Sequence, residues 1–160
     1  ELASLSAFTL ATWIKFNATP NDYDRLVSCH TTAGGLDWFM DKDGKLALAI
    51  DGTTKLSGVV TIPQNSWVFL AVTRASGGGL VFYVSGAAGS LSASNGGPLS
   101  ATPTIGGSHK LRIGGTQRTT QDRTPDAWFD EVRIFDRALT QEELQAIATA
   151  TKPPATTPAP

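Results

Sequence analysis

The sequence has very little cysteine and histidine. Cys29 is the single cysteine among 160 residues, which excludes an internal disulfide and a cysteine-based zinc cluster. Its neighbours Leu26 and Val27 are typical of a strand, so we expect a buried, unreactive thiol. The two histidines, His30 and His109, have no histidine two or four residues away, so a zinc site has little support.

The sequence also lacks an excess of charge and a long apolar run. Thirteen Lys and Arg residues against fourteen Asp and Glu residues leave a net charge of -1, so neither nucleic acid nor an anionic membrane is an expected partner. No segment approaches the roughly 18 apolar residues of a membrane span, and no basic segment with an apolar core opens the chain. We therefore interpret the chain as a mature or excised module of one domain.

Short alternating segments separated by turn residues make up most of the sequence. Strands are expected at residues 8–16, 25–30, 36–40, 45–51, 59–62, 67–73, 80–84 and 110–114, with a last one around Val132 and Ile134. The run DKDG at 41–44 predicts a hairpin turn. Residues 86–107 are mostly small and predict no element. The pattern favours an all-β, antiparallel two-sheet β-sandwich.

One short helix is expected after the last strand. Thr140 and Glu143 form a Thr-x-x-Glu capping box, in which the hydroxyl and the carboxylate each satisfy a free backbone donor at a helix start. The box predicts a helix from Gln141 to near Thr149.

Three segments together resemble laminin-G-like jelly-roll domains of the concanavalin A-like lectin/glucanase superfamily. They are FTLATWIK at 8–15, NSWVFLAVT at 65–73 followed by LVFYVSG at 80–86, and FDEVRIFDRALTQEEL at 129–144. The resemblance covers nearly the whole chain to about residue 150 and implies a jelly roll. These domains usually begin with a further strand that carries an Asp-Gly segment, and only residues 1–7 stand there in this sequence.

The C-terminal residues differ in composition from the rest. Residues 151–160 (TKPPATTPAP) have the Pro/Thr composition of an extended linker, so we divide the chain into a β-sandwich module at 1–150 and a linker at 151–160. Such linkers are common in secreted proteins, which favours a secreted or cell-surface module joined to catalytic or adhesion domains.

The superfamily contains glycoside hydrolases, so the sequence must be tested for their catalytic carboxylates. Retaining members carry paired glutamates on one strand, about 5 Å apart. The glutamates here are Glu1, Glu131, Glu142 and Glu143, of which the last two fall on the expected helix. The paired machinery is missing, so we expect a module that is not an enzyme.

The aspartates suggest a structural calcium ion. If Val132 and Ile134 face the core, alternation buries Asp130, and a buried carboxylate needs a partner. Calcium would satisfy it, and the resemblance implies a calcium ion near this strand in many relatives. Asp130 could equally lie at the wet end of the strand or pair with an arginine. Asp22 and Asp24 form a second acidic group that could bind calcium or a sugar hydroxyl, or form a solvated turn.

Aromatic residues beside polar loops are the candidates for glycan binding, because flat rings stack on the C–H faces of sugars. Trp13 and Trp67 fall opposite their aliphatic neighbours and are expected to be structural, beneath the helix. The candidate ligand-binding residues are Trp38, Trp128, Tyr23, Arg118, Asp122 and Arg123.

The sequence therefore predicts a non-catalytic carbohydrate-binding module that targets a polysaccharide or a cell-surface glycan. The alternatives are a protein-binding adhesion domain and a structural spacer, because all three uses occur on this kind of fold.

Overall fold

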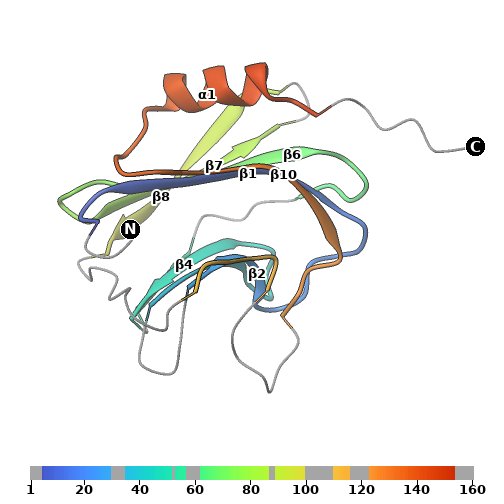
Figure 1. The fold of residues 1–160 in the computed structure, drawn as a ribbon, viewed down its shortest axis with the longest axis horizontal. Helices are drawn as coiled ribbons and strands as arrows, with labels where there is room; N and C mark the ends of the chain where they lie inside the picture. Colours follow the sequence, from blue (N-terminus) through green and yellow to red (C-terminus); the bar gives the residue numbers. More distant parts are fainter. Residues whose placement is uncertain are drawn as a thin grey trace, which may run out of the picture.

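The protein is a sandwich of two antiparallel sheets with one helix outside it (Figure 1). A computed structural model describes residues 5–29, 35–51, 53–56, 62–86, 89–99, 110–115 and 123–153. Within these residues each sheet has five strands, and every neighbouring pair is antiparallel. This architecture confirms the predicted all-β sandwich with a short C-terminal helix.

Sheet I lies beneath the helix and has the strand order β10-β1-β6-β7-β8. Its strands are β1 (Phe8–Phe16), β6 (Val68–Arg74), β7 (Gly79–Ser85), β8 (Leu91–Pro98) and β10 (Ala127–Phe135). Sheet II has the order β5-β4-β3-β2-β9. Its strands are β2 (Asp24–Ser28), β3 (Leu36–Met40), β4 (Leu46–Ile50), β5 (Thr53–Leu56) and β9 (Arg112–Ile113).

The main core lies between the two sheets. The inward-facing residues of β1 include Phe8, Leu10, Ile14 and Phe16, which are all at most 1% exposed. On sheet II, alternating positions of β3 and β4 face them, because successive side chains of a strand point to opposite sides. The outward positions of sheet II are thereby left to polar and aromatic side chains, which form the site described below.

A second, smaller core lies between sheet I and α1 (Gln141–Ala150). Leu144 and Ala148 of the helix pack in one cluster with Trp13 and Phe69 of the sheet, and these two rings meet edge to face at 5.5 Å. The Trp13 indole N–H donates to Thr151 Oγ1 at 3.2 Å. The expected capping box of Thr140 and Glu143 is present, and the structural interpretation of Trp13 is confirmed.

The turn at residues 41–44 is the predicted hairpin between β3 and β4. Asp41 Oδ1 accepts from the backbone N–H groups of Asp43 and Lys45 at 3.0 and 2.8 Å, and Gly44 adopts a φ of 71°. Asp41 thus uses its carboxylate to shape the turn.

A β-bulge interrupts β10 and changes which side Asp130 faces. Glu131 has a φ of 50°, and the pairing of β1 with β10 shifts between Ala11 and Trp13. Phe129 and Val132, three positions apart, therefore both pack against the main core, while Trp128 and Asp130 are exposed. The prediction that Asp130 is a buried carboxylate is wrong, because simple alternation does not continue through a bulge.

Candidate functional site

Aromatic and arginine side chains stack together where β2 begins. The Tyr23 ring is stacked on Phe39 with centroids 5.4 Å apart, and the Arg123 guanidinium lies 4.6 Å from the Tyr23 centroid. The Arg25 guanidinium lies 4.3 Å from the Phe39 centroid. Cations at these distances are attracted to the ring faces. We call Tyr23, Arg25, Asp37, Phe39 and Arg123 the Tyr23 cluster.

A buried ion pair forms the base of the cluster. Arg25 Nη2 lies 3.1 Å from Asp37 Oδ2, and both side chains are 4% exposed. Ser28 Oγ donates to Asp37 Oδ1 at 2.5 Å, so the carboxylate has a partner on each oxygen. β2 and β3 pair antiparallel, which places these outward side chains next to one another. Opposite charges at outward positions of two neighbouring strands were the sequence signal for this pair, which the sequence analysis missed.

Tyr23 is held in an unusual backbone conformation. Its φ of 67° lies in the left-handed region, which costs a non-glycine residue roughly 1–3 kcal/mol unless the surroundings fix it. The Tyr23 N–H donates to Met40 O at 2.8 Å, and Arg25 Nη1 donates to Tyr23 O at 3.1 Å. Asp24 Oδ2 closes the loop by accepting from the Asn21 N–H at 2.7 Å. The loop therefore presents the Tyr23 side chain in a fixed position.

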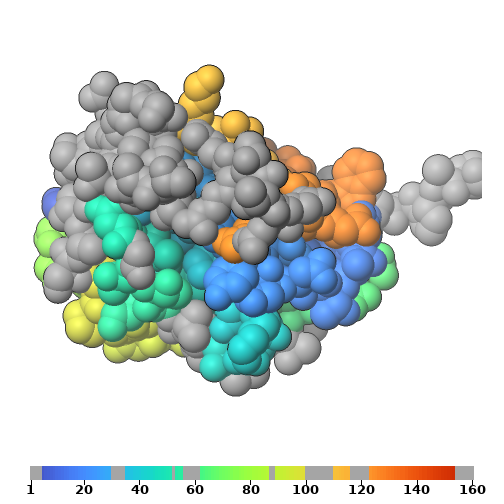
Figure 2. Space-filling view, turned by 90° about the horizontal axis from the view of Figure 1, so that it is seen from below, coloured from blue at the N-terminus to red at the C-terminus, as the bar shows by residue number. Residues whose placement is uncertain are grey.

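The upper part of the cluster is open to solvent. Tyr23 is 42% exposed. The segment that begins at Arg123 is held beside β2 by a backbone hydrogen bond of 2.9 Å, which the Arg25 N–H donates to Arg123 O. In Figure 2, which looks onto sheet II, the blue residues around β2 adjoin the orange residues that lead into β10. A phenol ring beside a guanidinium supplies an apolar surface together with several hydrogen-bond donors. Such a surface can hold a sugar ring and its hydroxyl groups.

The structure brings together two of the six predicted ligand-binding residues, Tyr23 and Arg123. Arg118 and Asp122 lie outside the described residues. Trp128 is 61% exposed but lies on sheet I, on the outer face rather than beside Tyr23.

Trp38 corrects the sequence analysis. It is fully buried in the main core, so no face of its ring is open to a ligand. Its place in β3, in step with the inward residues Leu36 and Met40, was the signal that could have identified it as a core residue.

The aspartates proposed for calcium belong to two separate groups, Asp130 on β10 and Asp22 with Asp24 where β2 begins. Asp130 is exposed, and its Oδ1 accepts from the Glu131 N–H at 2.8 Å. Asp24 is buried in its loop, whereas Asp22 is exposed. Within the described ranges, no group of three or more Asp, Glu, His or Cys side chains converges as metal ligands would. Calcium binding stays a prediction, and a change of melting temperature on adding EDTA would test it.

The described glutamates have contacts within the fold. Glu131 Oε2 accepts from Arg133 Nη2 at 2.6 Å beside the bulge. Glu143 accepts from Arg137 at 2.7 and 2.9 Å and also from the Thr140 N–H. The Arg137 guanidinium and the Thr140 amide together hold the pKa of Glu143 at about 2. Each of these two carboxylates thus stabilises a local element.

Cys29 is buried, as expected. Its side chain is 0% exposed, and its Sγ lies 3.7 Å from Leu36 O. Burial, with a smaller effect from the negative charge of Asp37, raises the pKa of the thiol to about 11. The thiol therefore stays protonated at neutral pH and is a poor nucleophile.

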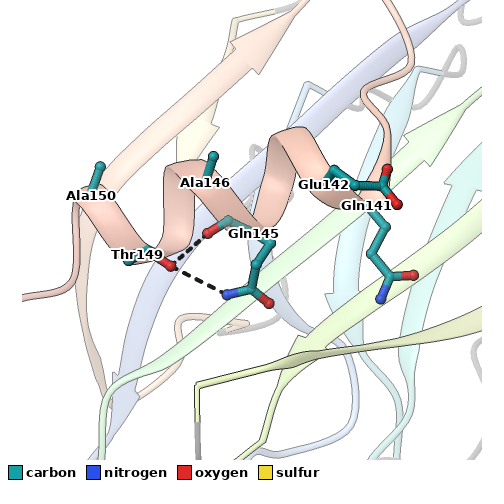
Figure 3. A pocket seen from close by; sticks show the side chains of 6 residues that line it. All are labelled: Gln141, Glu142, Gln145, Ala146, Thr149 and Ala150. Carbon is teal, nitrogen blue, oxygen red and sulfur yellow. Dashed lines mark hydrogen bonds between the residues drawn. The ribbon is translucent and has the colours of Figure 1, made fainter.

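A shallow hollow of about 570 Å³ lies along α1, lined by Gln141, Glu142, Gln145, Ala146, Thr149 and Ala150 (Figure 3). Gln145 is already engaged there, since its side chain donates to Gly89 O at 3.0 Å and accepts from Leu91 N at 2.9 Å. Gln141 donates to Leu91 O at 3.0 Å. These glutamines join the helix to strand β8 rather than offering free groups to a ligand.

No helix among the described residues is both long and apolar enough to span a membrane.

Solved structures with the same fold include a candidate carbohydrate-binding protein, a pentraxin and a neurotoxin. A candidate carbohydrate-binding protein from Bacteroides ovatus is 18% identical with a TM-score of 0.68, over 88% of this chain and 40% of its own. A heptameric SAP-like pentraxin from Limulus polyphemus is 16% identical with a TM-score of 0.64, over 90% of this chain and 70% of its own. Botulinum neurotoxin type C, whose cell entry depends on two ganglioside molecules, is 15% identical with a TM-score of 0.62, over 92% of this chain and 36% of its own.

Identities this low establish the fold and not the ligand, and this chain spans well under half the length of two of the three proteins. A comparison with curated proteins finds no match. A family model matches residues 1–145, which is most of the chain. On that match, the chain belongs to the concanavalin A-like lectin/glucanases superfamily, as its closing segment suggested.

Proposed function

We propose that this chain is a non-catalytic carbohydrate-binding module of a secreted multidomain protein. It targets that protein to a polysaccharide or a cell-surface glycan, and residues 151–160 link it to the next domain. The observation that carries the proposal is the solvent-open stack of Arg123 on Tyr23, built over the buried Arg25–Asp37 pair.

The physical properties of the cluster suit a sugar. A pyranose offers an apolar C–H face and a ring of hydroxyl groups, so it is held best by an exposed ring with charged donors beside it. Tyr23 supplies the ring, and Arg123 supplies the donors. Because Phe39 and Arg25 support Tyr23 from below, little side-chain entropy is lost when a ligand binds.

The structural relatives support the same class of ligand. The Bacteroides ovatus protein is named as a candidate carbohydrate-binding protein, and cell entry of the neurotoxin depends on two ganglioside molecules. Tethering has a physical benefit as well, since a module bound to a polymer increases the effective concentration of a linked domain at the polymer surface.

A glycan and insoluble-polysaccharide array tests the proposal, run with calcium and with EDTA. We expect wild-type protein to bind at least one glycan, and Tyr23→Ala and Arg123→Ala each to weaken that binding about tenfold or more. Arg133→Ala is the matched control, because Arg133 pairs with Glu131 on the other sheet, and it should bind as wild type does. Binding unchanged in Tyr23→Ala and Arg123→Ala would remove the Tyr23 cluster from the site. No glycan binding at all would favour the protein-adhesion alternative.

A further inference from the structure

Three side chains form a row across the outer face of sheet I. Lys15 on β1 lies directly opposite Trp128 on β10. On its other side, the pairing of Ile14 with Val68 places Trp67 beside Lys15, and Lys15 Nζ lies 5.8 Å from the centroid of Trp67. Directly opposed residues of antiparallel strands point to the same face. We call Trp128, Lys15 and Trp67 the aromatic strip.

The strip begins where α1 ends. The helix covers Trp13, which lies two residues before Lys15 on the same face of β1, and Thr151 just beyond the helix accepts a hydrogen bond from the Trp13 indole. Trp128 is 61% exposed, and Trp67 and Lys15 are half-buried. The sequence analysis placed Trp67 beneath the helix, whereas the structure leaves part of the ring uncovered.

A cavity lies beside Trp13, on the side of sheet I that carries the strip. It has a volume of about 390 Å³ and lies between the C-terminal end of α1 and the turn from β7 to β8. Its wall contains Trp13, Ser90, Thr149 and Lys152. The cavity thus offers hydroxyl groups and an ammonium group, and Trp13 is the residue of its wall that shares a face of β1 with Lys15.

We propose that the aromatic strip and the cavity beside Trp13 form a second glycan site, which binds an extended oligosaccharide. Strands in a sheet are about 4.8 Å apart, so Trp128 and Trp67 stand roughly 10 Å apart with Lys15 between them. That spacing exceeds a single sugar ring and suits two rings of one extended chain. Lys15 then donates to the hydroxyl or carboxylate groups between the two stacked rings.

This inference rests on the proposed function, since it assigns the ligand of a second surface to the same class. The two surfaces differ in the ligand feature that each recognises. The Tyr23 cluster lies on sheet II and offers a single exposed ring, whereas the strip lies on sheet I and offers the exposed ring of Trp128 and the half-buried ring of Trp67. The strip therefore depends on ligand length, and the Tyr23 cluster does not.

The test compares hexasaccharides with their monosaccharides by calorimetric titration. The probes are hexasaccharides of β-1,4-linked glucose, xylose and N-acetylglucosamine, and of α-1,4-linked galacturonic acid. We expect at least one hexasaccharide to bind, and Trp128→Ala and Lys15→Ala each to weaken it about tenfold. Trp67→Ala should do the same, but Trp67 packs partly against the helix core, so the two other variants keep the test valid if it unfolds.

The controls separate this proposal from the general one. Monosaccharide binding should be unchanged in Trp128→Ala and Lys15→Ala. If both variants bind the hexasaccharide as strongly as wild type does, the strip is not the site. The same conclusion follows if wild-type protein binds glycans on the array but binds none of the four hexasaccharides. In both of these cases the Tyr23 variants still report on the proposed function. A wild-type protein that binds no glycan in any format would overturn both.

Discussion

Arg25 and Asp37 show how single residues combine stability with function. Both are charged, yet each side chain is only 4% exposed and lies on the outward side of sheet II. Removing two charges from water costs several kcal/mol per ion, and the pair recovers that cost only with good geometry and further hydrogen bonds. Ser28 and the Tyr23 carbonyl supply those bonds. The pair thus positions the Tyr23 loop at the same time as it satisfies its own charges.

Asp37→Asn should lower the free energy of unfolding by roughly 3–5 kcal/mol, because it leaves the buried Arg25 guanidinium without its carboxylate. Urea denaturation followed by tryptophan fluorescence measures the change. Lys42→Ala is the control, since the Lys42–Asp43 pair is exposed and should add nothing measurable. Equal stability of Asp37→Asn and wild type would show that the buried pair is energetically neutral.

Tryptophan positions show where residue-scale reasoning from the sequence fails. Trp38 and Trp128 both adjoin polar loops in the sequence, yet one is 0% and the other 61% exposed. The difference depends on which side of its strand each faces. The side that Trp128 faces cannot be inferred by counting alternate residues back from Val132, because the bulge at Glu131 lies between them and breaks the alternation.

At the scale of elements, the bulge in β10 decides how the last strand meets β1. Thr12, buried in the core side of β1, donates from Oγ1 to Asp130 O at 3.1 Å and so satisfies a carbonyl at the bulge. A hydroxyl at this core position is explained by that bond. Thr12 is therefore a polar core residue whose hydroxyl is satisfied by the bulge in β10.

Replacing Glu131 tests the backbone of the bulge. Glu131→Val should be less stable than Glu131→Gly by roughly 1–3 kcal/mol, because glycine accepts a φ of 50° and a β-branched residue does not. Both variants lose the carboxylate that pairs with Arg133, so the difference between them isolates the backbone. Chemical denaturation of the two variants gives the comparison, and identical midpoints would count against a fixed left-handed residue here.

The cap of α1 makes the helix sensitive to acid. The pKa of Glu143 is lowered from 4.5 to about 2, chiefly by Arg137 and then by the Thr140 amide. A lowered pKa in the folded state means that the stabilisation is complete above pH 4.5 and is lost as the pH falls towards 2. Thermal unfolding of wild type and Glu143→Gln across this range should show a gap in melting temperature that closes at low pH. A gap that stays constant down to pH 2 would contradict the assignment.

At the scale of the whole molecule, the fold was predicted well and the site only in part. Periodicity identified the buried strands, since residues such as Leu36 and Leu48 alternate with outward ones. It missed β5 and β8, which lie at sheet edges and whose sequences TTKL and LSASNGGP carry few apolar residues. The Tyr23 cluster depends on contacts between segments about a hundred residues apart, which no local pattern contains.

The two cores should unfold together. Leu144 is fully buried against Trp13, so Leu144→Ala should cost about 2–5 kcal/mol of stability. Because the helix core shares sheet I with the main core, we expect far-ultraviolet circular dichroism and tryptophan fluorescence to show one coincident transition in this variant. Early loss of the helix signal, with the fluorescence transition unmoved, would show that α1 is an independent appendage.

The place of β1 in sheet I, between β10 and β6, has a consequence for how the protein is made. β1 leaves the ribosome long before β10, with which it pairs, and Thr9 Oγ1 donates to the carbonyl of Arg137 at 2.8 Å. The backbone groups on one edge of β1 therefore remain unpaired until almost the whole module has been synthesised. Pairing over such a distance is slow, and an unpaired apolar strand is prone to aggregate. Nascent chains of this module are thus expected to need protection by a chaperone until β10 emerges.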